Sequence, residues 1–261
     1  MWKRAIRVGM VGGAALGLTV GCVTAGLWRR SDRVVIRDIL GSSVQVVLER
    51  RGDRVRSGSG VVIVARSDQT RSDRTGMECL VLTSGHTFAG GRESDDTELY
   101  VLLDRHLGGG ARARAALLAH RETKEVDLAL LRVRVPHCLA ARVGLPPALG
   151  ERIWIVGFPW GRQVRLITGI VSQVTIDDGG KLRAGASLMV DASVVYGMSG
   201  SGVFDAATGR LVGLIEGYGT ARVSFGEKTP LQYIDIPVPG ETYVTSVGTI
   251  ERFLRESGHS P

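Results

Sequence analysis

The sequence is poor in cysteine and contains no cluster of positive charge. Three cysteines in 261 residues leave one unpaired, which argues against a disulfide scaffold, and no Cys/His spacing resembles a zinc site. Lys3, Arg4 and Arg7 carry part of the net charge of +7, and no Lys/Arg-rich block of the nucleic-acid-binding kind follows them. We therefore expect no metal, no organic cofactor and no nucleic-acid partner.

Helical periodicity is also scarce, whereas glycine is abundant. Only one segment repeats apolar residues at helical spacing, at Val247, Ile250, Phe253 and Leu254. The 36 glycines and the many short β-type segments favour strands joined by tight turns. Prolines punctuate residues 135–150, which predicts a crossover between two halves. The sequence thus indicates an all-β fold of paired β-barrels with a short C-terminal helix.

The N-terminal segment has the character of an export signal or a membrane anchor. Its basic start is followed by an uncharged run over residues 8–28, long enough to span a bilayer as a helix of about 20 residues. A cleaved signal peptide and a lipid-modified Cys22 in LTVGC are the alternatives. All three export the remainder of the chain. We therefore separate residues 1–33, the signal or anchor, from an exported domain over residues 34–261.

Three short motifs supply a histidine, an acid and a serine in that order. LTSGH contains His86, EVDLALL contains Asp127 and GMSGSG contains Ser199. Serine hydrolysis needs a nucleophile, a base that takes its proton and a carboxylate that orients the base. An α/β-hydrolase would place the serine first, within G-x-S-x-G, but Ser201 occupies the last position of that pattern. Each motif alone fits an ordinary turn or strand end, but together they predict a serine hydrolase. Ser199 is the expected nucleophile, and Ser201 is the alternative.

Two cysteines lie at comparable distances from the predicted catalytic residues. Cys79 stands seven residues before His86, and Cys138 stands eleven residues after Asp127. Antiparallel neighbouring strands that meet at the histidine and the acid would bring both cysteines to their other end. The sequence leaves two alternatives for these cysteines. Cys79 and Cys138 form a disulfide, or they are two separate buried thiols.

The same motifs, with their flanking residues, resemble those of trypsin-like serine proteases of the HtrA (Deg) type. The similarity extends over residues 44–254 and includes LTSGH, DLALLRV, GERIWIVGFPWGRQVRLITGIVS, VDASVVYGMSGSGVF and GRLVGLIEG. It implies a chymotrypsin/trypsin-like pair of six-stranded antiparallel barrels. We expect the first barrel over residues 34–140, the second over 141–245 and the helix over 246–258. HtrA proteins usually carry a PDZ domain, and we expect none here.

The resemblance assigns a role to each candidate residue. It makes His86 the general base, Asp127 its orienting acid and Ser199 the nucleophile. Backbone N–H groups of Gly197, Met198 and Ser199 would form the oxyanion hole. Met198 also occupies the position where trypsin-type zymogens have an aspartate. Activation by a newly freed N-terminus is therefore not expected.

The resemblance also places the walls of the substrate pocket at Ser193, Tyr196, Glu216 and Tyr218. Residues 193–195 carry no charge, so we expect cleavage after a small or aliphatic residue. The predicted function is a serine endopeptidase that cleaves exported or misfolded polypeptides through an acyl-enzyme. We expect it in the bacterial periplasm or cell envelope, either membrane-anchored or secreted. The alternative is an inactive protease fold that acts as a binding module.

Overall fold

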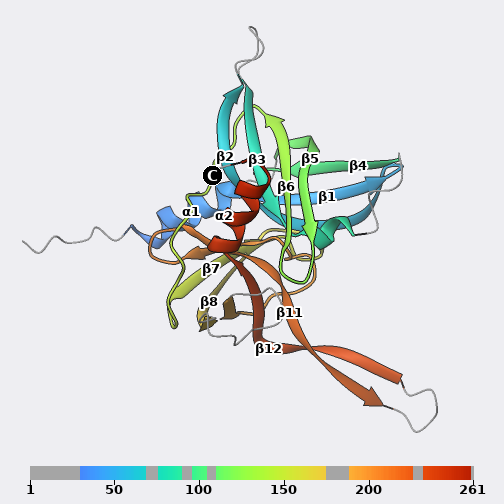
Figure 1. Cartoon of the computed structure of the whole chain (residues 1–261), viewed down its shortest axis with the longest axis vertical. Coiled ribbons are helices and arrows are strands. Elements are labelled where there is room, and N and C mark those ends of the chain that lie inside the picture. The colour runs from blue at the N-terminus through green and yellow to red at the C-terminus, as the bar shows by residue number, and fades with distance from the viewer. Residues whose placement is uncertain are drawn as a thin grey trace, which may run out of the picture.

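The computed structural model describes residues 30–68, 76–89, 96–104, 110–174, 188–225 and 232–259. They form two closed six-stranded antiparallel barrels in succession, as predicted (Figure 1). The first barrel has the strand order β1-β2-β3-β6-β5-β4, and the second has the order β10-β11-β12-β9-β8-β7. The strands of the first barrel are β1 (Ser43–Arg50), β2 (Asp53–Asp68), β3 (Gly76–Thr83), β4 (Thr97–Leu102), β5 (Arg112–Glu122) and β6 (Asp127–Val135). Those of the second are β7 (Arg152–Gly157), β8 (Arg165–Val174), β9 (Leu188–Asp191), β10 (Gly202–Asp205), β11 (Leu211–Phe225) and β12 (Gln232–Ser246).

Each barrel has its own core, and a third apolar cluster joins the two barrels. Strand β6 shows how one sequence serves two cores, because Leu128 to Leu131 are all buried. Ala129 and Leu131 belong to the core of the first barrel, whereas Leu128 and Leu130 face the cluster shared with the second. A continuous apolar run is expected of a strand buried on both faces. The shared cluster therefore holds the two barrels against each other.

Two helices complete the shared cluster. Helix α2 (Val247–Glu256) contributes Ile250, Phe253 and Leu254, as its periodicity predicted, and its N-cap Ser246 accepts from the Thr249 N–H group. Helix α1 (Asp32–Ser42) contributes Val35 and Ile39 and was not predicted. Both helices lie beside the junction of the barrels in Figure 1.

Residues 1–29, with Cys22 and most of the predicted signal or anchor, lie outside the described residues. Among the helices of the described part, none has the length and apolar character needed to cross a membrane.

Strands β11 and β12 continue beyond the second barrel as a two-stranded arm (Figure 1). We define the arm as residues 220–225 of β11 and 232–237 of β12. A register shift between Tyr218 and Thr220 separates it from the barrel part of the same strands. The sequence does not predict the arm, because glycines and prolines interrupt residues 217–240.

Replacing Phe253 by alanine tests the shared cluster. The ring is fully buried between the barrels, so Phe253→Ala should lower the free energy of unfolding by about 3–5 kcal/mol. Arg252→Ala, on the exposed side of the same helix, should change it by less than about 0.5 kcal/mol. Denaturant unfolding of both variants provides the measurement. Equal effects would show that α2 does not help to join the barrels.

Candidate active site

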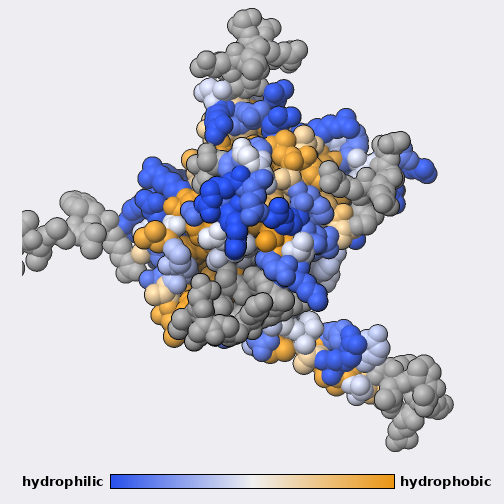
Figure 2. Space-filling model, in the orientation of Figure 1, coloured by the Kyte–Doolittle hydropathy of each residue, from blue (hydrophilic) through white to orange (hydrophobic). Residues whose placement is uncertain are grey.

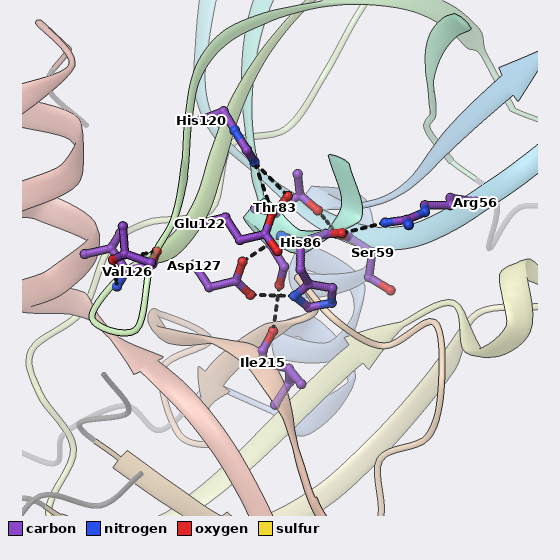
Figure 3. Close-up of polar contacts among 12 residues, drawn as sticks. Arg56, Ser59, Thr83, His86, His120, Glu122, Val126, Asp127 and Ile215 are labelled. Atoms are coloured by element: carbon purple, nitrogen blue, oxygen red, sulfur yellow. Dashed lines mark hydrogen bonds and ion pairs between the residues drawn. The ribbon is translucent and has the colours of Figure 1, made fainter. Parts of the chain in front are cut away.

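The register of two neighbouring strands brings His86 and Asp127 together. Thr83 at the end of β3 pairs with Ala129 near the start of β6, so the residues that follow Thr83 lie beside Asp127. The short 3-10 helix η1 (Gly85–Phe88) then presents His86. Its ring Nδ1 lies 2.5 Å from Asp127 Oδ2, and its backbone N–H group donates to Asp127 Oδ1 at 2.6 Å (Figure 3). One carboxylate thus orients both the ring and the main chain of the histidine.

Close packing around Gly85 makes this approach possible. A Cβ atom at Gly85 would lie 2.4 Å from the Arg121 carbonyl oxygen and 2.9 Å from Asp127 Oδ1. Only glycine therefore fits between β3 and the start of β6. The Nε2 atom of His120 lies 3.0 Å from the Gly85 carbonyl oxygen, at hydrogen-bonding distance, which supports the same turn from strand β5.

The surroundings of His86 raise its pKa above the ordinary value of 6.5. Burial alone would lower the pKa, since it disfavours the charged ring, but the hydrogen bond and the charge of Asp127 outweigh it. Glu122 and Glu216 add smaller effects in the same direction. Asp127 itself is only 9% exposed, so its charge acts on the ring with little screening by water.

The loop that carries Ser199 has the backbone conformation needed for an oxyanion hole. The Tyr196 carbonyl accepts from the Trp160 N–H group at 2.9 Å, and Gly197 has φ +89°. Because the peptide unit is planar and trans, the Gly197 N–H group points away from that carbonyl. Among the described residues, neither the Gly197 nor the Ser199 N–H group donates a hydrogen bond. Both remain available to a substrate oxygen.

The prediction that Met198 contributes a third oxyanion donor is wrong. Its N–H group donates to the Val195 carbonyl at 3.1 Å and is therefore already occupied. Its side chain is fully buried in the core of the second barrel. Met198 anchors the loop rather than lining the hole.

Ser59 of β2 links the first barrel to the loop of Ser199. Its N–H group donates to the Ser199 carbonyl and its hydroxyl donates to the Gly197 carbonyl, both at 2.9 Å. The same hydroxyl accepts from the Phe158 N–H group at 2.9 Å, and Thr83 Oγ1 donates to the Ser59 carbonyl at 2.6 Å. These four hydrogen bonds connect the end of β3, which leads to His86, with the nucleophile loop and the residue that follows β7. Sequence reasoning missed Ser59, because a small polar residue in an apolar strand gives no signal of its partners.

A cavity of about 50 Å³ lies at the meeting point of these elements. It is lined by Arg56, Ser57, His86, Thr87, Tyr196, Gly197 and Ser199. The base and the nucleophile thus open onto the same space, although no hydrogen bond joins them among the described residues. Such a bond often forms only once substrate is present. A larger cavity of about 720 Å³, beside α1 and lined also by residues 139–142 and 207–210, shares no residue with this one.

The other predicted residues fall into different places. Of the four predicted pocket residues only Tyr196 lines the cavity; Ser193, Glu216 and Tyr218 do not. The rival hydroxyl of Ser201 is buried and has no hydrogen-bond partner among the residues that the structure describes. It is therefore not accessible to a substrate.

Cys79 and Cys138 form a disulfide, with their Cα atoms 6.6 Å apart. The register of β3 and β6 accounts for the pair, since Cys79 lies opposite Val133 and Cys138 follows shortly after β6 ends. The disulfide thus closes the far end of the strands that meet at His86 and Asp127.

Comparison with known proteins agrees with this geometry. The family described as trypsin-like peptidase domain matches residues 58–214, which hold the histidine, the acid and the serine. The chain belongs to the trypsin-like peptidase family. No curated protein matches the sequence.

Solved structures of HtrA and Deg proteases have the same fold. A serine endoprotease from Yersinia pestis superposes with a TM-score of 0.63 at 18% identity, over 87% of this chain and 66% of that one. The HtrA-type protease AlgW with a tripeptide superposes with a TM-score of 0.62 at 19% identity, over 87% of this chain and 63% of that one. Deg5 superposes with a TM-score of 0.59 at 17% identity, over 85% of this chain and 91% of that one. This chain therefore spans less than two thirds of the length of the first two proteins.

Removal of the Ser59 hydroxyl should impair the site without unfolding the protein. Ser59→Ala keeps the N–H bond to Ser199 but leaves the Gly197 carbonyl without its donor. We expect the rate of fluorophosphonate labelling at Ser199 to fall roughly 10- to 100-fold, as for a misplaced catalytic group. Ser43→Ala is the matched control, because it removes another buried hydroxyl, bonded to the Ile39 carbonyl at 2.7 Å, outside the site. Equal labelling rates for the two variants, with thermal unfolding followed in parallel, would refute a positioning role for Ser59.

The raised pKa of His86 predicts the pH dependence of the site. Only the neutral ring can accept the Ser199 proton, so reactivity is lost as pH falls through the pKa of the folded protein. The labelling rate should therefore rise with pH with a midpoint above 6.5. Glu216→Gln should lower that midpoint, because it removes a negative charge that favours the protonated ring. A midpoint below 6.5 in the unmodified protein would contradict this account of the site's electrostatics.

Proposed function

We propose that this protein is a serine endopeptidase that hydrolyses polypeptides through an acyl-enzyme. One observation carries the proposal: His86, held by a buried carboxylate, opens onto the same cavity as Ser199. Gly197 and Ser199, whose N–H groups donate no hydrogen bond within the described part of the chain, line that cavity as well. Together these groups supply a base, a nucleophile and donors for an oxyanion.

The proposed reaction uses each of these groups in turn. Ser199 Oγ attacks the carbonyl carbon of the scissile bond while His86 Nε2 takes its proton. The N–H groups of Gly197 and Ser199 stabilise the negative oxygen, and Asp127 stabilises the protonated ring. His86 then gives the proton to the leaving amine, and the same steps with water as nucleophile release the acyl group.

The substrate assignment rests on several supports. The structure of an HtrA-type protease with a similar fold contains a tripeptide. This supports polypeptides rather than small esters as substrates of the present protein. The uncharged residues 193–195 support cleavage after a small or aliphatic side chain. The proposed pocket walls are Tyr196, which lines the cavity at Ser199, and Ser193, Glu216 and Tyr218, which lie outside that cavity. The basic start and apolar run of the N-terminus support an exported enzyme of the bacterial cell envelope, acting on exported or misfolded proteins.

Fluorophosphonate labelling beside casein cleavage tests the proposal. The unmodified protein and Ser201→Ala should be labelled and should cleave casein, because the Ser201 hydroxyl is buried. Ser199→Ala should do neither, since it lacks the nucleophile. A folded protein that is not labelled at all would overturn the endopeptidase and leave the protease fold as a binding module.

A further inference from the structure

The arm formed by β11 and β12 has two chemically different faces. Residues directly opposite each other in an antiparallel pair share a face, so Val223 shares one with Ile234, and Ala221 shares it with Ile236. Alternation along β11 adds Phe225 to this face. We call these five residues the apolar face of the arm. It carries no charged residue.

The opposite face of the arm is polar, and its side chains contact one another. Arg222 makes two hydrogen bonds to Asp235, at 2.8 and 3.0 Å, and its guanidinium group lies 4.2 Å from the centre of the Tyr233 ring. These contacts link the two strands to each other. Within the described residues, the apolar face has no hydrogen bond or ion pair of this kind, and its large side chains are exposed.

Exposure of the apolar face is large for side chains of this kind. Val223, Phe225, Ile234 and Ile236 are 45%, 50%, 53% and 45% exposed, respectively. Hydrophobic and hydrophilic residues both lie on the arm in Figure 2. A contiguous apolar patch on a protruding element marks an interaction site. A two-stranded ribbon is also marginally stable alone in water and gains stability when its apolar face is covered.

Strand β11 connects this face directly to the active site. The Ile215 carbonyl accepts from Ser84 Oγ at 3.1 Å and from the Gly200 N–H group at 2.8 Å, between the histidine turn and the nucleophile loop. Glu216 lies close enough to act on the pKa of His86. From Glu216 to Val223 the strand advances by roughly 23 Å, at about 3.3 Å per residue. An extended polypeptide needs about seven residues to cover the same distance.

We propose that the apolar face of the arm binds an extended apolar segment of the polypeptide substrate while the scissile bond lies at Ser199. The proposal rests on the endopeptidase function above and adds a second recognition site outside the cleft. Its partner is a chain with apolar side chains about seven or more residues from the bond that is cut. Binding would combine apolar contacts on the face with β-type pairing along the open edges of the ribbon.

A triple variant makes the face much less apolar while preserving its shape, and leaves Phe225 and Ala221 in place. Val223→Thr, Ile234→Thr and Ile236→Thr keep side chains branched at Cβ, which suits a strand. The control protein carries Thr220→Ser and Ser224→Thr on the polar face. Both full-length proteins are assayed on a peptide of about four residues and on two peptides of about twelve, which differ in whether the distant half is apolar or serine-rich.

We expect the triple variant to lose about tenfold in kcat/KM on the long apolar peptide, mainly through KM. Its kcat/KM on the other two peptides, and its fluorophosphonate labelling rate, should stay within about twofold of the unmodified protein. The control protein should match the unmodified protein throughout. An equal loss on all three peptides, or no loss on any, would overturn the proposal. A difference in oligomeric state between the triple variant and the unmodified protein, measured by light scattering, would also overturn it. Such a difference would assign the face to a second copy of the chain.

A binding measurement separates failure of the proposal from failure of the proposed function. Fluorescence anisotropy of the labelled long apolar peptide is followed with Ser199→Ala, and with Ser199→Ala combined with the triple substitution. Weaker binding to the combined variant supports the arm even if the unmodified protein shows no cleavage. Equal binding to both, alongside normal cleavage by the unmodified protein, refutes the arm alone.

Discussion

The hydrogen bonds of Ser59 across the seam between the barrels set the geometry of the whole site. His86 and Asp127 belong to the first barrel, whereas Ser199 and its N–H donors belong to the second. Apolar packing in the shared cluster holds the barrels together but is not directional. Ser59 adds directional contacts, because its N–H and hydroxyl groups donate to two carbonyls of the nucleophile loop in a fully buried setting, alongside the bond from Ser84 Oγ to the Ile215 carbonyl. Buried groups of this kind are costly to leave unpaired, so the contact also specifies the loop conformation.

The nucleophile loop is held by a backbone hydrogen bond and by a buried apolar side chain rather than by charge. The Trp160 N–H group turns the Tyr196 carbonyl away from the site, and the Met198 side chain is locked in the core. A side chain at Gly197 would meet the Trp160 nitrogen at 2.6 Å, so glycine is required where the chain bends. Trypsin-type zymogens reach the equivalent state through an ion pair with a new N-terminus. Here apolar anchoring takes that place, which suits a site already formed in the folded chain.

Much of this architecture could be predicted from the sequence, for physical reasons that differ by element. Helix α2 has a helical repeat of apolar residues, and the order of His86, Asp127 and Ser199 carries the chemistry directly. Helix α1 was missed because its residues 34–36 are β-branched and favour strands. The arm was missed because glycines and prolines interrupt residues 217–240. The direction of the Met198 N–H group and the hydrogen-bond partners of Ser59 depend on tertiary contacts. No local sequence pattern predicts such contacts.

A crystal structure of the protein with a peptide boronate bound at Ser199 would test the central claim most directly. Tetrahedral boron imitates the intermediate, so its oxygen marks the position of the oxyanion. The account predicts that this oxygen lies within hydrogen-bonding distance of the Gly197 and Ser199 nitrogens, with the Ser59 contacts unchanged. A Tyr196 carbonyl turned into that position, or a Ser59 hydroxyl detached from Gly197, would contradict it.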